Sequence, residues 1–299
     1  MNMEFYDVAL FFFIYSFLGW CTEVAFAGCK EHRFINRGFL NGPVCPIYGS
    51  GVSAVIVLLT PFQNNLIVLY ILSVVLVTVL EGLTGWAMDK IFHNKWWDYS
   101  NMPLNIGGYV CLLFSLIWGV ACVAIMKLIH PLVAKGVDFL PRPLGWVLIV
   151  GFSILLIVDT CVTSSAIFKF NKKLEHMEKI AAELHELSDQ LGENIYSTTS
   201  RVVETAEGIQ ENLHEKHQEA IEEFQAKAQD MEEELYERRQ DATENLRAHM
   251  AELKKRYGEL KQTPDKNARR LLRAFPKLES RQHQERVQEI REQWRKLKK

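Results

Sequence analysis

Apolar residues along this chain follow two different patterns, which meet near residue 171. In the first pattern, long apolar stretches alternate with short polar connections. These stretches cover residues 5–27, 44–60, 66–88, 107–129 and 144–168. A helix needs about 20 residues to cross a hydrocarbon core about 30 Å thick. The pattern therefore predicts an all-α fold whose first domain, residues 1–170, is a polytopic membrane helix bundle of about five spans.

The second pattern is a narrow apolar stripe that steps by three, four and four residues from Leu184 to Tyr257. Eleven residues in three turns is close to the natural repeat of an α-helix, so the stripe stays nearly straight. It predicts a second domain, residues 171–262, built as one long helix with hendecad, coiled-coil periodicity. The stripe favours a homo-oligomer formed through residues 184–257. The alternative is a helix lying on the membrane, but such helices usually carry basic polar faces.

Charge divides the chain in the same way and adds a third segment. Residues 1–171 hold nine basic and nine acidic side chains, residues 172–262 hold 13 and 22, and residues 263–299 hold 12 and 5. We therefore expect a neutral membrane block, an acidic arm and a short basic, amphipathic helical tail over residues 263–299. The acidic arm and anionic lipid are candidate partners for the tail. Nucleic acid is not expected, because glutamates interleave with the basic residues and no recognition motif is present.

Flanking basic residues orient the predicted bundle. Eight Lys and Arg side chains lie in the connections and ends assigned to the cytoplasm, and three lie in those assigned outside. The positive-inside rule then predicts an outside N-terminus and a cytoplasmic arm. Stretch 44–60 is short, and if it re-enters the membrane instead of crossing it, the orientation of everything before it changes.

A polar, turn-rich stretch, residues 34–51, separates the first two apolar stretches. At membrane depth, irregular backbone survives only where it is buried in protein or lines a wet cavity. This stretch is therefore either a plain cytoplasmic connection or the entry to a polar site at the membrane face. The second interpretation is favoured by acids near the inner ends of the predicted spans: Glu23, Glu81, Asp89 and Asp159.

A charge inside a bilayer is costly unless a partner offsets it. We expect Arg37 to offset this cost by pairing among Glu23, Glu81 and Asp98, and Glu81 in particular to form a coupled pair with Arg37. Asp98 either accepts from Arg37 or a polar ligand, or caps a turn before Ser100. Asn105 is either a turn residue or an inward-facing hydrogen-bonding group. The predicted substrate-binding residues, all near the cytoplasmic face, are Glu23, Asn36, Arg37, Glu81, Asp98 and Asn105.

Four motifs carry a resemblance to a known family: FLGWCTE (17–23), NRGFLNGPVCPIYGSG (36–51), LEGLTGWAMD (80–89) and WWDYSNMPLNIGG (96–108). Over roughly residues 5–165, the chain resembles a group of bacterial membrane proteins called CmpB or "ABC-transporter type IV". The group's name assigns its members to ABC-transporter permeases. The resemblance implies a permease in a bacterial cell membrane, and it brings no substrate with it.

Several catalytic signatures are missing from the sequence. No GxxxxGK[ST] motif is present, so any ATPase of such a transporter is expected to be a separate subunit. Neither an HExxH nor a GxSxG motif is present, and we expect no catalytic residue, metal or cofactor. Besides the permease, two functions stay open: a membrane-anchored scaffold whose arm recruits partners, and an intramembrane enzyme.

Overall fold

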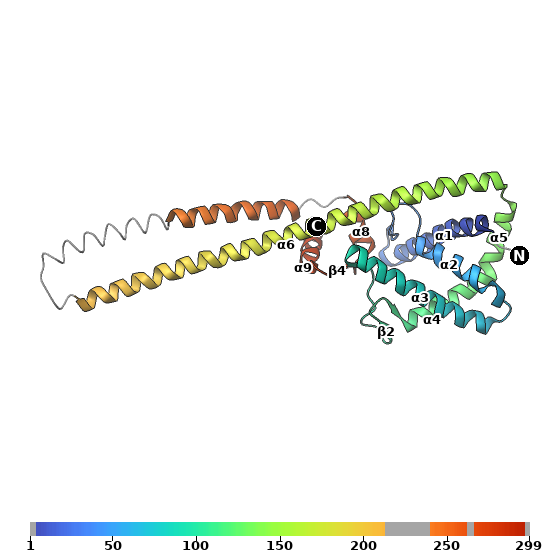
Figure 1. Ribbon diagram of the computed structural model, residues 1–299, viewed down its shortest axis with the longest axis horizontal. Helices are drawn as coiled ribbons and strands as arrows, with labels where there is room; N and C mark the ends of the chain where they lie inside the picture. The colour runs from blue at the N-terminus through green and yellow to red at the C-terminus, as the bar shows by residue number, and fades with distance from the viewer. Residues whose placement is uncertain (1–3, 213–239, 262–265, 297–299) are drawn as a thin grey trace. The chain divides into compact units, whose positions relative to one another are not determined.

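The computed structural model describes residues 4–212, 240–261 and 266–296 (Figure 1). The chain divides into two compact units. The first, which we call the membrane unit, combines Met1–Lys172 with Pro264–Arg295. The second, the arm unit, consists of Lys173–Thr263 and Lys296–Lys299. The end of the predicted tail, residues 297–299, lies outside the described residues.

The membrane unit is helical apart from two small ladders. Its helical elements are α1 (Phe5–Glu31), α2 (Pro46–Leu59), the 3-10 turn η1 (Thr60–Phe62), α3 (Leu66–Phe92), α4 (Leu112–Ala124), the π-helical η2 (Ile125–Ile129), α5 (His130–Phe139), the first part of α6 (Arg142–Asn212), α8 (Lys266–Ala274) and α9 (Gln284–Lys296). Its strands pair antiparallel as β1 (Asn94–Lys95) with β4 (Glu279–Ser280), and β2 (Asn105–Ile106) with β3 (Val110–Cys111).

Four helical segments are long and apolar enough to cross a membrane: Phe5–Glu31, Leu66–Phe92, Leu112–Phe139 and Arg142–Glu193. A fifth apolar segment, Pro46–Phe62, is shorter. The predicted helical membrane bundle is therefore confirmed, and stretch 44–60 forms the short helix α2. The core of the bundle surrounds α2, whose Val55, Ile56 and Leu59 are buried among residues of α1, α3 and the α4–α5 segment.

Helices α1 and α2 approach each other at glycines. A Cβ atom on Gly19 would come within 2.4 Å of the Tyr48 side chain. A Cβ on Gly49 would come within 2.0 Å of Ser16 Oγ and 2.4 Å of the Phe12 carbonyl oxygen. Small residues let helix backbones approach closely in membranes, where packing replaces the hydrophobic effect as the driving force.

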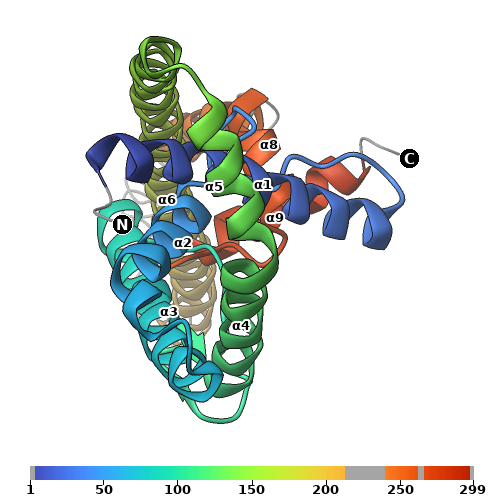
Figure 2. The same cartoon turned by 90° about the vertical axis from the view of Figure 1, so that its right-hand side faces the viewer.

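The fourth span differs from the prediction at both ends. The helix begins at Leu112 instead of residue 107, because Gly107 and Gly108 have positive φ and belong to the turn between β2 and β3. It continues past residue 129 through η2 and α5, which bend away from α4 (Figure 2). Pro131 explains the bend, since proline lacks the N–H that an α-helix would use at that position.

The arm unit begins where α6 continues without interruption from the membrane segment to Asn212. Residues 240–261 are also helical and lie alongside α6 (Figure 1). His249 Nε2 lies 3.5 Å from Glu183 Oε1, and Leu253 is buried. Part of the predicted 184–257 stripe is therefore covered by the chain's own returning helix. Its middle, residues 213–239, lies outside the described residues, and homo-oligomerisation stays a prediction.

Candidate functional site

The loop between α1 and α2 is held from inside by the Asn36 amide. Asn36 Oδ1 accepts hydrogen bonds from Trp20 Nε1 at 2.8 Å and from the Gly38 N–H at 3.0 Å. Asn36 Nδ2 donates to the Asn41 carbonyl oxygen at 2.8 Å. The side-chain oxygen and nitrogen of Asn36, a predicted binding residue, therefore form hydrogen bonds within the loop and to α1.

A carboxylate from α6 holds the same loop by its amide groups. Asp159 accepts from the Asn41 and Gly42 N–H groups at 3.1 and 2.7 Å, and from Asn41 Nδ2 at 2.9 Å. Thr163 Oγ1 donates to the same carboxylate at 3.2 Å. Asp159 therefore satisfies backbone groups that would otherwise be unpaired beside the apolar bundle.

A guanidinium from α8 holds the loop by its carbonyl groups. Arg270 donates through Nη1 to the Gly38 and Leu40 oxygens at 2.8 and 2.9 Å, and through Nη2 to the Phe39 oxygen at 2.7 Å. Burial lowers the pKa of Arg270, and the charge of Asp159 opposes this shift. We call Asp159 and Arg270 together the loop clamp, because an anion takes the amides and a cation takes the carbonyls.

Two of the predicted site residues form an ion pair beside this loop. Arg37 Nε lies 3.6 Å from Glu23 Oε2, and Tyr48 donates its hydroxyl to Glu23 Oε1 at 2.6 Å. The Arg37 guanidinium also lies over the Phe26 ring, 5.6 Å from its centroid. The predicted Arg37–Glu81 pair is wrong: the loop folds Arg37 back against the end of α1, where Glu23 lies.

Glu81 instead faces the loop between β1 and β2. Tyr99 donates its hydroxyl to Glu81 Oε1 at 3.3 Å, whereas Glu81 Oε2 is enclosed without a hydrogen-bond partner. Burial raises the pKa of Tyr99 well above its usual range, and the charges of Glu81 and Glu23 raise it further. The phenol therefore stays protonated and lies near both carboxylates. We call this group the polar cluster: Glu23, Arg37, Tyr48, Glu81 and Tyr99.

The structure puts Asp98 and Asn105 in the turns of the β1–β3 region. Asp98 Oδ1 accepts from the Ser100 N–H, the Ser100 hydroxyl and Lys95 Nζ. Burial raises the pKa of Asp98, but these hydrogen bonds outweigh it and leave the pKa below the usual range. Asn105 donates to the Met102 carbonyl oxygen and accepts from the Gly108 N–H. Both side chains therefore stabilise the turns of the loop that carries Tyr99.

Within the membrane unit, the basic tail contacts α3 at Asp89, a carboxylate that is not among the predicted binding residues. Arg281 Nε lies 2.9 Å from both oxygens of Asp89, and Tyr109 donates its hydroxyl to the same carboxylate. The Asp89 side chain is 5% exposed and the Arg281 side chain 51%. The excess basic charge of residues 263–299 was the only sequence signal for this contact, and it did not name the partner.

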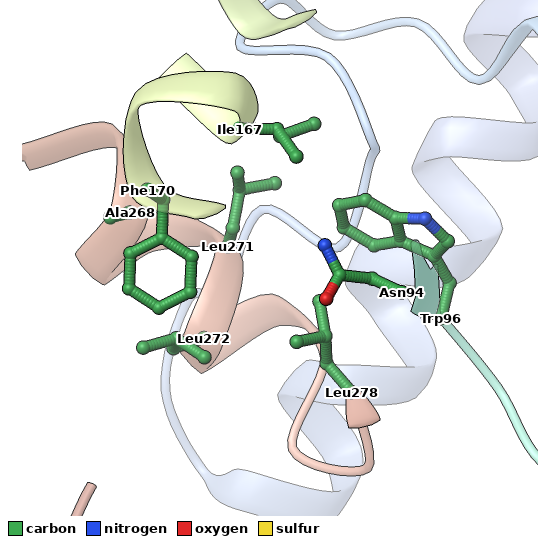
Figure 3. A pocket seen from close by; sticks show the side chains of 8 residues that line it. All are labelled: Asn94, Trp96, Ile167, Phe170, Ala268, Leu271, Leu272 and Leu278. Carbon is green, nitrogen blue, oxygen red and sulfur yellow. The ribbon is translucent and has the colours of Figure 1, made fainter. Parts of the chain in front are cut away.

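Apolar side chains complete the tail contact (Figure 3). Residues in and directly after β1 and residues of α6 meet residues of α8 and the residue before β4 around a small cavity, whose lining is Asn94, Trp96, Ile167, Phe170, Ala268, Leu271, Leu272 and Leu278. The Trp96 ring also meets Phe275 edge-on, with centroids 4.9 Å apart. This cavity is too small for a substrate and lies apart from the residues of the polar cluster.

These observations define a helical membrane protein with an extended arm. Residues 10–164 match the model of the family described as "Putative ABC-transporter type IV". The match covers more than half of the chain, and the protein belongs to this family. No curated protein and no solved structure matches the chain. Within residues 4–212, 240–261 and 266–296, no group of three or more His, Cys, Asp or Glu side chains is arranged to hold a metal ion.

Proposed function

We propose that the protein is the membrane-spanning component of an ABC-type transporter and that the polar cluster handles its substrate at the cytoplasmic face. The observation that carries the proposal is Glu81, whose Oε2 is enclosed without a hydrogen-bond partner while its Oε1 accepts from Tyr99, a phenol whose pKa the charge of Glu23 also raises. A buried carboxylate oxygen without a hydrogen-bond partner destabilises the fold, so such a group often marks a functional site. Family membership supports the same class of function.

The chemistry of the cluster favours a solute that donates hydrogen bonds or carries positive charge. The cluster contains two carboxylates and one guanidinium, so acidic groups outnumber basic ones. Both tyrosine hydroxyls already donate to the carboxylates. Glu81 Oε2 is the acceptor left for a ligand. Because the sequence has no P-loop, ATP hydrolysis belongs to a separate ATPase subunit. A homo-oligomer would combine the apolar segments of several chains around one transport path.

The topology we propose has the N-terminus outside, the inner loops and arm in the cytoplasm, and the protein in the bacterial cell membrane. The eight-to-three asymmetry of basic residues supports it. The contacts of Arg270 with the α1–α2 loop and of Arg281 with the end of α3 support it further, because they gather the basic tail at the same end of the bundle.

Native purification followed by mass spectrometry of co-purifying proteins tests the assignment to a transporter. We expect an ATPase to accompany the wild-type protein. Candidate cationic solutes are then screened by uptake into cells, comparing wild type with Glu81→Gln. Glu186→Gln, an exposed carboxylate of the arm, is the control. Uptake that is unaffected by Glu81→Gln, or the absence of any ATPase, would count against the proposal.

A scaffold is the second candidate, and it is favoured by the unbroken continuation of α6 from the membrane segment into the arm. A rigid helix of this kind is suited to presenting partners away from the membrane. Deletion of residues 172–262 distinguishes the two functions: a scaffold would lose its co-purifying proteins, whereas a transporter would keep an ATPase bound to the membrane unit.

A further inference from the structure

The tail segment, residues 266–281, packs against the rest of the membrane unit through contacts of two kinds. Its charged contacts are Arg270 with the three loop carbonyls and Arg281 with Asp89. Its apolar contacts come from Ala268, Leu271 and Leu272, which are buried on one face of α8. The tail thus lies directly on the loop that carries Arg37.

This interface leaves several polar atoms without partners. Asn94 Oδ1, Trp96 Nε1 and Arg270 Nε are buried there and make no hydrogen bond. A buried polar atom without a partner opposes the docked state, because water would satisfy it if the tail moved away. The cavity in Figure 3 adds to this, since atoms that line a void lose packing contacts. The docked tail is therefore held less firmly than its number of contacts suggests.

The outer face of the same helix is strongly basic. Lys266, Arg269 and Arg273 are exposed on α8, and Lys277 follows it. A helix with one apolar face and one basic face binds membranes that contain anionic lipid, placing its apolar side among the acyl chains. The docking site lies at the end of α3 and beside Ile167 and Phe170 of α6. In the topology proposed above this is the cytoplasmic face of the bundle, so lipid headgroups are within reach of a short helix that moves away from the site.

We propose that residues 266–281 form a latch that exchanges between its docked position and anionic lipid. In the docked position, Arg270 completes the loop clamp and closes the loop over the polar cluster. On anionic lipid, Leu271 and Leu272 leave the cavity for the bilayer, the three loop carbonyls lose their donor, and the loop loosens. Anionic lipid would thereby control access to the site proposed above, although the exchange itself needs no substrate.

Cys45 reports the state of the loop, because it is buried directly after the clamped residues. The full chain is reconstituted in nanodiscs of phosphatidylcholine alone or mixed with phosphatidylglycerol, and maleimide labelling of each cysteine is followed by peptide mass spectrometry. Exposed Cys29 is the reference for reagent activity, and Cys122, buried in the bundle, is the reference for intact folding. Trypsin cleavage within residues 266–273 measures release of the tail directly.

We expect phosphatidylglycerol to speed both Cys45 labelling and trypsin cleavage by at least about fivefold, the lower end of typical couplings between linked sites. Arg270→Ala should label rapidly in both lipids. Arg273→Ala, which removes the same charge from the exposed face of the same helix, should label slowly in phosphatidylcholine and respond weakly to phosphatidylglycerol. If Arg270→Ala also exposes Cys122, Arg281→Gln replaces it as the release variant.

Equal rates for the wild-type protein in the two lipids would overturn the proposal. A rate that changes only when residues 172–262 are deleted would overturn it as well, because the acidic arm would then be the tail's second partner. Failure of the transport assignment would leave these rates unchanged, since the assay contains no substrate.

Discussion

At the scale of single residues, the polar loop between α1 and α2 survives beside an apolar bundle because both kinds of backbone group have charged partners. Asp159 accepts from two N–H groups, and Arg270 donates to three carbonyl oxygens. Hydrogen bonds to charged groups are stronger than neutral ones and are costly to lose when buried. The loop is therefore an ordered structure held by specific hydrogen bonds.

Replacing Asp159 by Asn should destabilise the membrane unit by about 2–3 kcal/mol, since one oxygen becomes a donor that faces another donor. Equilibrium unfolding in mixed detergent measures the change in the free energy of unfolding. Asp138→Asn is the control, because Asp138 is exposed on α5. Equal effects of the two substitutions would show that the loop does not depend on the Asp159 charge.

The ion pair in the polar cluster gives a second prediction. In a double-mutant cycle, Glu23→Gln and Arg37→Gln should be coupled by up to about 1 kcal/mol, the usual value for a partly exposed pair. Glu81→Gln and Arg37→Gln should be additive, because the guanidinium of Arg37 pairs with Glu23. Coupling of the second combination and not the first would reverse the assignment of partners.

At the scale of elements, the short helix α2 is placed by close contacts and not by its length. Gly49 brings its backbone against Ser16 and Phe12 of α1, while Gly51, one half-turn further on, has open space around it. Two glycines of the same helix thus have opposite roles. The sequence alone does not distinguish them.

Gly49→Ala should destabilise the bundle by about 1–3 kcal/mol, because the added methyl group meets the Phe12 backbone and cannot be accommodated by a side-chain shift. Gly51→Ala should be neutral or stabilising by up to about 1 kcal/mol, since alanine favours the helix and meets nothing. Thermal unfolding of both variants in one detergent compares them. Similar losses at both positions would contradict the close approach of α1 and α2.

The sequence predicted the elements better than the contacts between them. Apolar stretch length is local information, and it located α1, α3, the α4–α5 segment and the membrane part of α6. Partner choice is not local: Asp159 lies 118 residues from Asn41 in the chain, and Arg270 lies 231 residues from Phe39. The sequence-based pairing of Arg37 with Glu81 is wrong, because nothing in the local pattern shows where a clamped loop directs its side chain.

At the scale of the whole molecule, the arm unit supplies a partner for its own apolar stripe. Glu183 and His249 are neighbours within one chain, and the helix of residues 240–261 lies along α6. This leaves two ways to cover the rest of the stripe: a compact hairpin within one chain, or a bundle of hairpins from several chains. The contact between Glu183 and His249 supports the first.

A chain carrying Glu183→Cys and His249→Cys on a background without the native cysteines tests the hairpin. A short bismaleimide should join the two positions within one chain and leave the protein at monomer size on a denaturing gel. Glu186→Cys with His249→Cys is the matched control at a nearby exposed position. Dimers as the main product would show that the helices pair between chains.

The membrane unit is discontinuous along the chain, and this has a consequence for biosynthesis. A ribosome releases the apolar segments up to residue 172 long before it reaches residues 266–281, which supply Arg270 and Arg281. During that interval Asp89 and the three loop carbonyls lack their final partners. The newly inserted bundle therefore reaches its final structure only after translation delivers the segment that completes it.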